Sequence, residues 1–149
     1  MSTRTLAVVA AAVELTTGSA LIANPSLLVH LLIGASLSSG GIAIGRVGGF
    51  GLLCLGLACW PSTSAVTAQA TLALFTYNLL AGFYIGYLGV IGGFVGYLLW
   101  PAFALHVLLA VLLAGPAYDT VRGRGRSRKA RLRAESSREA GQPPGARPV

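Results

Sequence analysis

The chain has 149 residues, of which 54% are hydrophobic and only 10% charged, and its formal net charge is +7. Its mean hydropathy of +0.73 lies outside the range usual for soluble globular proteins and favours a membrane protein. Most of the Lys and Arg residues follow residue 116. Among the first 116 residues, the charged side chains are Arg4, Arg46 and Glu14. No aromatic residues for base stacking are interleaved with this basic run, which argues against nucleic-acid binding.

Four apolar stretches are each long enough to form a helix that crosses about 30 Å of hydrocarbon, which takes about 20 residues. We therefore expect an all-α fold, with four transmembrane helices in a compact bundle within residues 1–116. The predicted spans are residues 6–23, 38–60, 68–89 and 91–114. Asn24-Pro25-Ser26 ends the first span, because proline lacks an amide donor and disfavours helix in the residue before it. Residues 27–34 are too few to cross and are expected to form an interfacial or re-entrant segment.

Residues 117–149 form a basic tail that we expect to be disordered, since Ser, Glu, Gly and Pro are frequent beyond Ala134. The basic run Arg122 to Arg133 follows the last span directly, and such flanks are retained in the cytoplasm. With an even number of spans, both termini are predicted to be cytoplasmic in a cytoplasmic (inner) membrane. The tail is expected to attract anionic lipid.

The start of the chain also permits a second interpretation. Arg4, the apolar run from Leu6 to Val13 and the small residues Gly18 to Ala20 together resemble a cleavable signal peptide. Cleavage would leave three spans. Glu14, which interrupts the apolar run, argues against cleavage.

Small residues at every fourth position predict where helices pack, because helices in lipid associate through close backbone approach. Such ladders occur in three of the predicted spans, and the glycines expected to pack are Gly41, Gly45, Gly49, Gly82 and Gly86, with Gly92 and Gly96 in the fourth span. The pattern predicts a tight bundle without a wide pore.

Each predicted span also contains one polar residue that is costly in hydrocarbon: Glu14, Arg46, Asn78 and His106. Counting 1.5 Å per residue from the outer ends places the first three at similar depth and His106 nearer the cytoplasm, within reach of Tyr77. We expect a Glu14–Arg46 ion pair with Asn78 bonded to one of its partners. The cluster has two interpretations, a structural network that fixes helix register and a site for a proton, a quinone-like headgroup or a small polar solute.

No nucleophile with an adjacent base and no metal-ligand set is visible, so the sequence indicates no catalytic residue, no metal and no cofactor. Cys54 and Cys59 lie in an apolar run and are expected to be buried free thiols. Pro101 falls inside the predicted fourth span, where it is expected to kink the helix.

The layout resembles the small four-helix bacterial membrane proteins of the DoxX and DoxX-like type. The resemblance covers about residues 5–115 and rests on Asn24-Pro25 after the first span, a short connecting segment, Gly45-Arg46-Val47-Gly48-Gly49 in a glycine-rich second span, and His106 in the last. It implies a four-helix membrane fold, with some relatives acting as accessory subunits of quinone-linked redox systems. No catalytic motif is carried over.

The leading functional hypothesis is an accessory or scaffold subunit, without enzymatic activity of its own, that packs against a larger membrane complex or against further copies of itself. The alternative is a small transporter or proton-coupled carrier that uses Glu14, Arg46, Asn78 and His106. A membrane-embedded enzyme ranks third.

Overall fold

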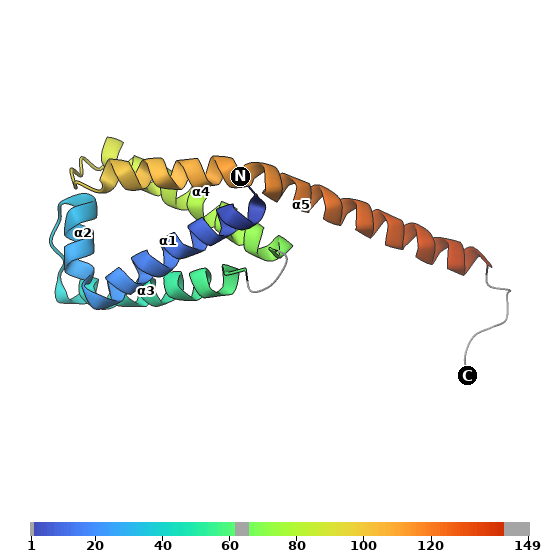
Figure 1. The fold of residues 1–149 in the computed structure, drawn as a ribbon, viewed down its shortest axis with the longest axis horizontal. Helices are drawn as coiled ribbons and strands as arrows, with labels where there is room; N and C mark the ends of the chain where they lie inside the picture. The colour runs from blue at the N-terminus through green and yellow to red at the C-terminus, as the bar shows by residue number, and fades with distance from the viewer. Residues whose placement is uncertain (1, 62–65, 142–149) are drawn as a thin grey trace. The chain divides into compact units, whose positions relative to one another are not determined.

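The computed structural model describes residues 2–61 and 66–141, and in this part of the chain all regular elements are helices (Figure 1). Residues 62–65, which follow the predicted second span, lie outside the described residues. The helices are α1 (Thr3–Ala23), α2 (Pro25–Ile33), α3 (Ser39–Cys59), α4 (Ala68–Val90) and α5 (Leu99–Gly141). Of these, α1, α3, α4 and the part of α5 up to Gly123 are long and apolar enough to cross a membrane.

The short segment between the first two long helices is itself a helix, α2, which links α1 to α3 at one end of the bundle (Figure 1). Asn24 ends α1 and begins α2, and its side-chain Oδ1 accepts a hydrogen bond from the Leu27 amide at 3.0 Å. Pro25 occupies the first turn, where its missing amide leaves no bond unmade. Gly34 then ends α2 with a φ of 73°, a conformation that favours glycine. The nine residues extend only about 14 Å, too short to cross a bilayer.

Helices α1 and α3 pack backbone against backbone through three glycines. A Cβ added to Gly18 would lie 2.8 Å from the carbonyl oxygen of Gly49, and one added to Gly49 would lie 2.8 Å from the oxygen of Gly18. Further along, Gly56 faces the Ala11 carbonyl and the Leu15 side chain. The prediction that Gly49 packs is confirmed, whereas Gly18 and Gly56 extend the interface beyond the expected ladder.

The other predicted glycines divide between two outcomes. Gly82 packs against Val107 and Gly86 against Phe103, so both lie in the α4–α5 interface as expected. Gly45 contacts Pro25 at the start of α2, while the three atoms nearest to an added Cβ at Gly41 belong to Leu37 and Ser38, just before its own helix. That Gly41 packs against another helix stays a prediction.

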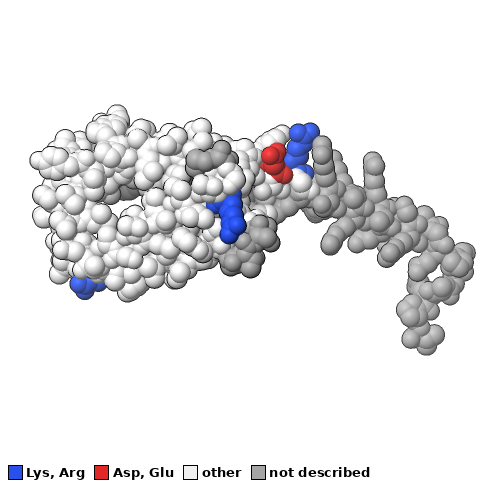
Figure 2. Space-filling model, in the orientation of Figure 1, with Lys and Arg blue, Asp and Glu red and all other residues white. Residues whose placement is uncertain are grey.

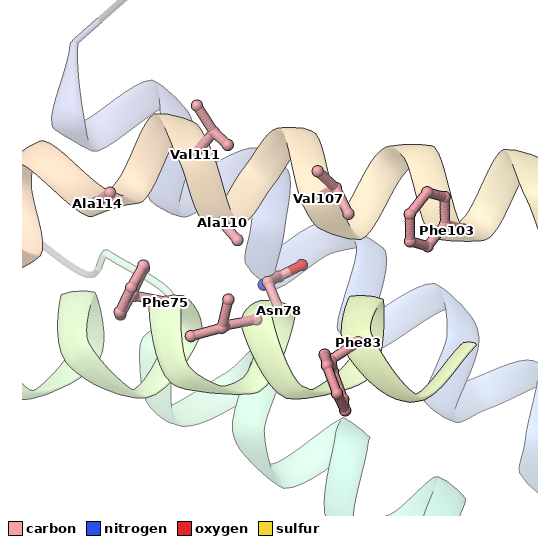
Figure 3. A pocket seen from close by; sticks show the side chains of 9 residues that line it. Phe75, Asn78, Phe83, Phe103, Val107, Ala110, Val111 and Ala114 are labelled. Atoms are coloured by element: carbon pink, nitrogen blue, oxygen red, sulfur yellow. The ribbon is translucent and has the colours of Figure 1, made fainter. Parts of the chain in front are cut away.

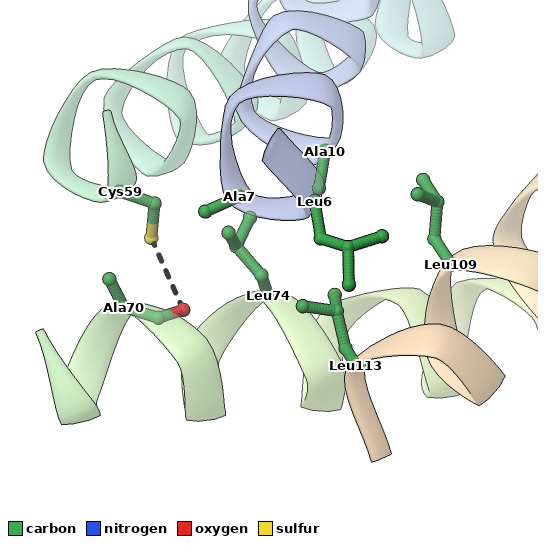
Figure 4. Close-up of a cluster of buried hydrophobic side chains, with 8 residues drawn as sticks. All are labelled: Leu6, Ala7, Ala10, Cys59, Ala70, Leu74, Leu109 and Leu113. Carbon is green, nitrogen blue, oxygen red and sulfur yellow. Dashed lines mark hydrogen bonds between the residues drawn. The ribbon is translucent and has the colours of Figure 1, made fainter. Parts of the chain in front are cut away.

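The apolar core lies where the first turns of α1 meet three other helices (Figure 4). Side chains from α1, α3, α4 and α5 form it: Leu6, Ala7, Ala10, Cys59, Ala70, Leu74, Leu109 and Leu113. The thiol of Cys59 donates to the carbonyl oxygen of Ala70 at 3.8 Å, which ties the end of α3 to the start of α4. Both cysteines are free as expected, but only Cys59 is buried, and Cys54 is exposed.

The fourth long helix begins later than predicted. Residues 91–98 form an irregular connection rather than the first two turns of the expected span 91–114. Within it, Gly96 approaches the backbone of Leu32, and the Leu98 amide donates to the Leu31 carbonyl at 2.8 Å. Pro101 consequently lies in the first turn of α5, where no preceding turn exists to be disrupted, so the predicted kink has no basis.

The chain divides into two compact units, Met1–Ala117 and Tyr118–Val149. In the second unit α5 continues to Gly141, whereas the composition predicted a disordered tail from residue 117. The segment from residue 128 to 140 is rich in Arg, Ala, Leu, Glu and Lys, all good helix formers, which accounts for this difference. Residues 142–149 of the expected tail lie outside the described residues.

The surface of the first unit is apolar and carries few charges (Figure 2). Large side chains such as Ile44, Phe83 and Val95 are at least three-quarters exposed. Contiguous exposed apolar surface of this kind is rare on soluble monomers. The long helices of this unit expose apolar side chains on their outer faces as well as burying them in the core.

Candidate functional site

Glu14 lies near the middle of α1 and is completely buried. Neither carboxyl oxygen has a hydrogen-bond partner among residues 2–61 and 66–141. The Tyr77 hydroxyl of α4 is a polar neighbour of this carboxyl but stands outside hydrogen-bond geometry. An unpartnered buried polar group of this kind costs about 1–3 kcal/mol and requires an explanation.

The expected Glu14–Arg46 ion pair is wrong, because Arg46 is exposed and the Glu14 oxygens are unpartnered. The reason is helical phase. Gly45, Gly49 and Gly56 fix the inner face of α3, and at about 100° per residue they lie within about 40° of one another. At the same 100° per residue, Arg46 lies about 60° from Gly49 and about 100° from Gly45 around the axis of α3. Arg46 therefore lies beside the inner face of α3 rather than on it.

Asn78 forms a different partnership from the one expected. It bonds neither Glu14 nor Arg46. Its Nδ2 donates to the Leu74 carbonyl oxygen at 2.9 Å, one turn back in α4, and its Oδ1 lies 2.9 Å from His106 Nδ1 of α5. Both side chains are buried, and the His106–Asn78 bond therefore joins α4 to α5 beside Gly82.

The expected proximity of His106 to Tyr77 is confirmed. Their rings meet edge to face, with centroids 5.9 Å apart and planes at 76°. Three of the four predicted polar residues thus belong to one neighbourhood, in the order Glu14, Tyr77, His106 and Asn78, while Arg46 stands apart.

A partly open cavity of about 600 Å³ lies on one side of this neighbourhood, lined by residues of α1, α2, α4 and α5 and by Leu52 of α3. Its wall is mostly aliphatic, with side chains such as Leu21, Leu28, Leu32 and Leu105. The polar side chains that line it are Thr17, Tyr77, Tyr84 and His106. A mostly apolar pocket with a few convergent polar groups is the usual form of a small-molecule site.

A second hollow, of about 430 Å³, runs between α4 and α5 on the other side of Asn78 (Figure 3). Its lining is almost entirely apolar, with Phe75, Phe83, Phe103 and Val111 among the side chains. Asn78 is its one polar lining residue, and it projects from α4 into the space between the two helices (Figure 3). The hydrogen-bonded Asn78–His106 pair therefore separates this groove from the larger cavity.

The sequence analysis named Tyr77 only as a neighbour of His106 and did not name Tyr84 as a site residue, so it missed both as cavity residues. A signal for Tyr77 was available, since it precedes Asn78 in a span with few other polar groups. The cavity itself had no sequence signal, because it depends on where α2 lies.

The side chains around the cavity offer hydrogen bonding and proton exchange: an imidazole, a phenol hydroxyl and, behind Tyr77, a carboxyl. Within residues 2–61 and 66–141 no group of three or more His, Cys, Asp or Glu side chains is arranged to hold a metal ion.

Comparison of the chain with protein-family models, with curated proteins and with solved structures finds no match. The resemblance to DoxX-type proteins therefore rests on the sequence features alone.

Proposed function

We propose that this chain is a multi-pass protein of the cytoplasmic (inner) membrane. Four segments cross the membrane in this proposal: α1, α3, α4 and the apolar part of α5. Four apolar helices and a charge-poor surface support this location. The basic residues that follow the fourth helix support a cytoplasmic C-terminus in contact with anionic lipid, and the even number of spans then makes the N-terminus cytoplasmic. The burial of α1 among three other helices supports its retention rather than its removal as a signal peptide.

Topology is tested by cysteine labelling in a Cys54→Ser background. Ser36→Cys, in the connection between α2 and α3, is expected to react with a membrane-impermeant maleimide in intact cells. Ser2→Cys, at the other end of the bundle, is expected to react only after lysis. The opposite pattern would reverse the orientation, and labelling of both sites in intact cells would contradict a sealed four-span topology.

We further propose that the protein binds a small, largely apolar ligand in the cavity between α1, α2, α4 and α5. The observation that carries this proposal is the pairing of an aliphatic wall with His106 and Tyr77 in one cavity of about 600 Å³. The hypothesis of an accessory subunit receives less support, because Gly49, Gly82 and Gly86 are engaged within the chain and are not free for a partner.

Ligand binding is tested with a matched pair of variants. Ala102 lines the cavity, whereas Ala104, two residues along the same helix, is exposed and outside it. Native mass spectrometry of the protein in lipid nanodiscs is expected to detect a bound small molecule in the wild type and in Ala104→Phe. Ala102→Phe is expected to lose it, because the phenyl ring occupies the cavity.

Two results would overturn this proposal. One is the absence of any retained molecule in wild type. The other is a stoichiometric protein partner that co-purifies equally with both variants, which would instead favour the accessory-subunit hypothesis.

Proton-coupled transport of the ligand is the second candidate, and the unpartnered Glu14 carboxyl favours it. In proteoliposomes, Glu14→Gln is then expected to abolish accumulation of the ligand driven by a pH gradient while leaving binding intact. Binding without gradient-driven accumulation in wild type would exclude this candidate.

A further inference from the structure

The orientation of the Asn78 amide is fixed by its own helix. The atom that lies 2.9 Å from the Leu74 carbonyl oxygen must be Nδ2, because a carbonyl oxygen can only accept a hydrogen bond. The reversed amide would set two oxygens against each other. Asn78 therefore turns Oδ1 toward α5.

This orientation in turn determines where the proton sits on His106. Oδ1 of Asn78 is an acceptor only, and it lies 2.9 Å from Nδ1 of His106, so Nδ1 carries the hydrogen and donates it. An uncharged imidazole carries one N–H, which leaves Nε2 with an unshared lone pair.

Nε2 can be reached from the cavity. The His106 ring lines the cavity, and Nε2 has no hydrogen-bond partner among the described residues. In that part of the chain, the fully buried side-chain atoms without a partner are the two Glu14 oxygens, so Nε2 is not sealed from the open space.

We propose that Nε2 of His106 accepts a hydrogen bond from the ligand, and that the cavity consequently takes an apolar alcohol or phenol. This inference rests on the proposed ligand binding and adds its chemistry. The hydroxyl supplies the donor that Nε2 lacks, and the aliphatic wall accommodates the apolar body. An ether or a carboxylate of the same shape has no hydrogen to donate, so it would place an oxygen lone pair against the lone pair of Nε2.

The tautomer is tested directly by nitrogen NMR on protein labelled with ¹⁵N-histidine. The chain has two histidines, and His30→Gln leaves only the signal of His106. We expect a protonated Nδ1 and a bare Nε2, with Asn78→Leu abolishing the preference for this tautomer. A proton on Nε2 in the folded wild type would overturn the inference.

The ligand class is tested with two probes that share one apolar body, 2-naphthol and 2-methoxynaphthalene. Binding to the protein in nanodiscs is measured by calorimetry, with empty nanodiscs as the control for partitioning into lipid. We expect wild type to bind the naphthol about fivefold more tightly, the gain typical of one neutral hydrogen bond.

Two variants assign that preference to Nε2. His106→Asn keeps an amide donor near the Nδ1 position for Asn78 but removes the Nε2 acceptor, so the preference is expected to disappear. His106→Gln places a carbonyl oxygen near the Nε2 position and is expected to retain part of it, which gives a second readout if the first variant does not fold.

The outcomes separate the inference from the function on which it rests. If wild type binds both probes equally, the inference is wrong while the cavity remains a ligand site. If wild type binds neither probe, ligand binding itself fails and the inference falls with it.

Discussion

The surroundings of Glu14 oppose folding. Its carboxyl is completely buried, and neither oxygen has a hydrogen-bond partner among residues 2–61 and 66–141. In natural proteins such violations of polar satisfaction concentrate at functional sites. The position beside Tyr77, which lines the cavity, is consistent with a role other than stability.

Replacing Glu14 by leucine is expected to stabilise the protein by about 1–3 kcal/mol, because it removes an unsatisfied buried polar group and keeps the space filled. Thermal unfolding in detergent measures the change. Glu14→Ala serves as the control, since it also removes the carboxyl but leaves a void and is expected to gain less. A loss of stability in Glu14→Leu would mean that the carboxyl has a partner that stabilises the fold.

The Asn78–His106 hydrogen bond should be visible as an interaction energy. We expect Asn78→Leu and His106→Leu to be non-additive by about 1 kcal/mol, because either substitution alone breaks the same bond. The control is the cycle Glu14→Gln with Arg46→Gln, which is expected to be additive within about 0.5 kcal/mol because these residues do not interact. Additivity in the first cycle, or coupling in the second, would contradict the observed partners.

At the scale of elements, glycine determines which helices approach closely. The α1–α3 contact brings the two backbones together at Gly18 and Gly49, and neither can carry a side chain without moving the other helix. On the same helix, Gly48 has no atom within 4 Å of an added Cβ.

Gly49→Ala is accordingly expected to destabilise the protein by about 1–3 kcal/mol, the usual cost of overpacking. Gly48→Ala, one residue away, is expected to be neutral or slightly stabilising, because alanine favours helix over glycine. Chemical denaturation of both variants in the same detergent makes the comparison. Equal effects would contradict the α1–α3 packing.

The existence of the long helices could be predicted from the sequence, because a run of about 20 apolar residues is a strong signal. The starting point of α5 could not. Residues 91–98 are as apolar as a span, so hydropathy does not distinguish their irregular backbone from helix. That error also displaced the depth assigned to His106, which was counted from residue 91.

The candidate site was predictable in its residues but not in its partners. Glu14, Asn78 and His106 were recognisable because polar side chains are rare in apolar helices. The direction of Arg46 depended on which glycines of α3 face α1. Several glycine ladders are compatible with that sequence, and only the observed packing selects one of them.

For the whole molecule, the distribution of charge is expected to decide orientation. Changing the Lys and Arg residues between 122 and 133 to Gln should produce a mixture of orientations, because little other positive charge remains to hold one end of the bundle inside. Maleimide labelling of Ser36→Cys is expected to fall toward half in intact cells. Changing Arg138 alone, farther along the chain, is the control and should leave labelling unchanged. Full labelling after neutralisation would show that the run does not set the orientation.

The position of Glu14 in α1, ahead of α4 in the chain, has a consequence for biosynthesis. α1 buries Glu14 but leaves the ribosome before α4, so in the proposed membrane topology Glu14 enters the bilayer before α4 and its Tyr77 have been translated. During that interval the carboxyl borders lipid on one side, at a cost of a few kcal/mol. Nascent chains that stall before α4 should therefore be poorly anchored and quickly degraded, which makes arrival of the third long helix the committing step of assembly.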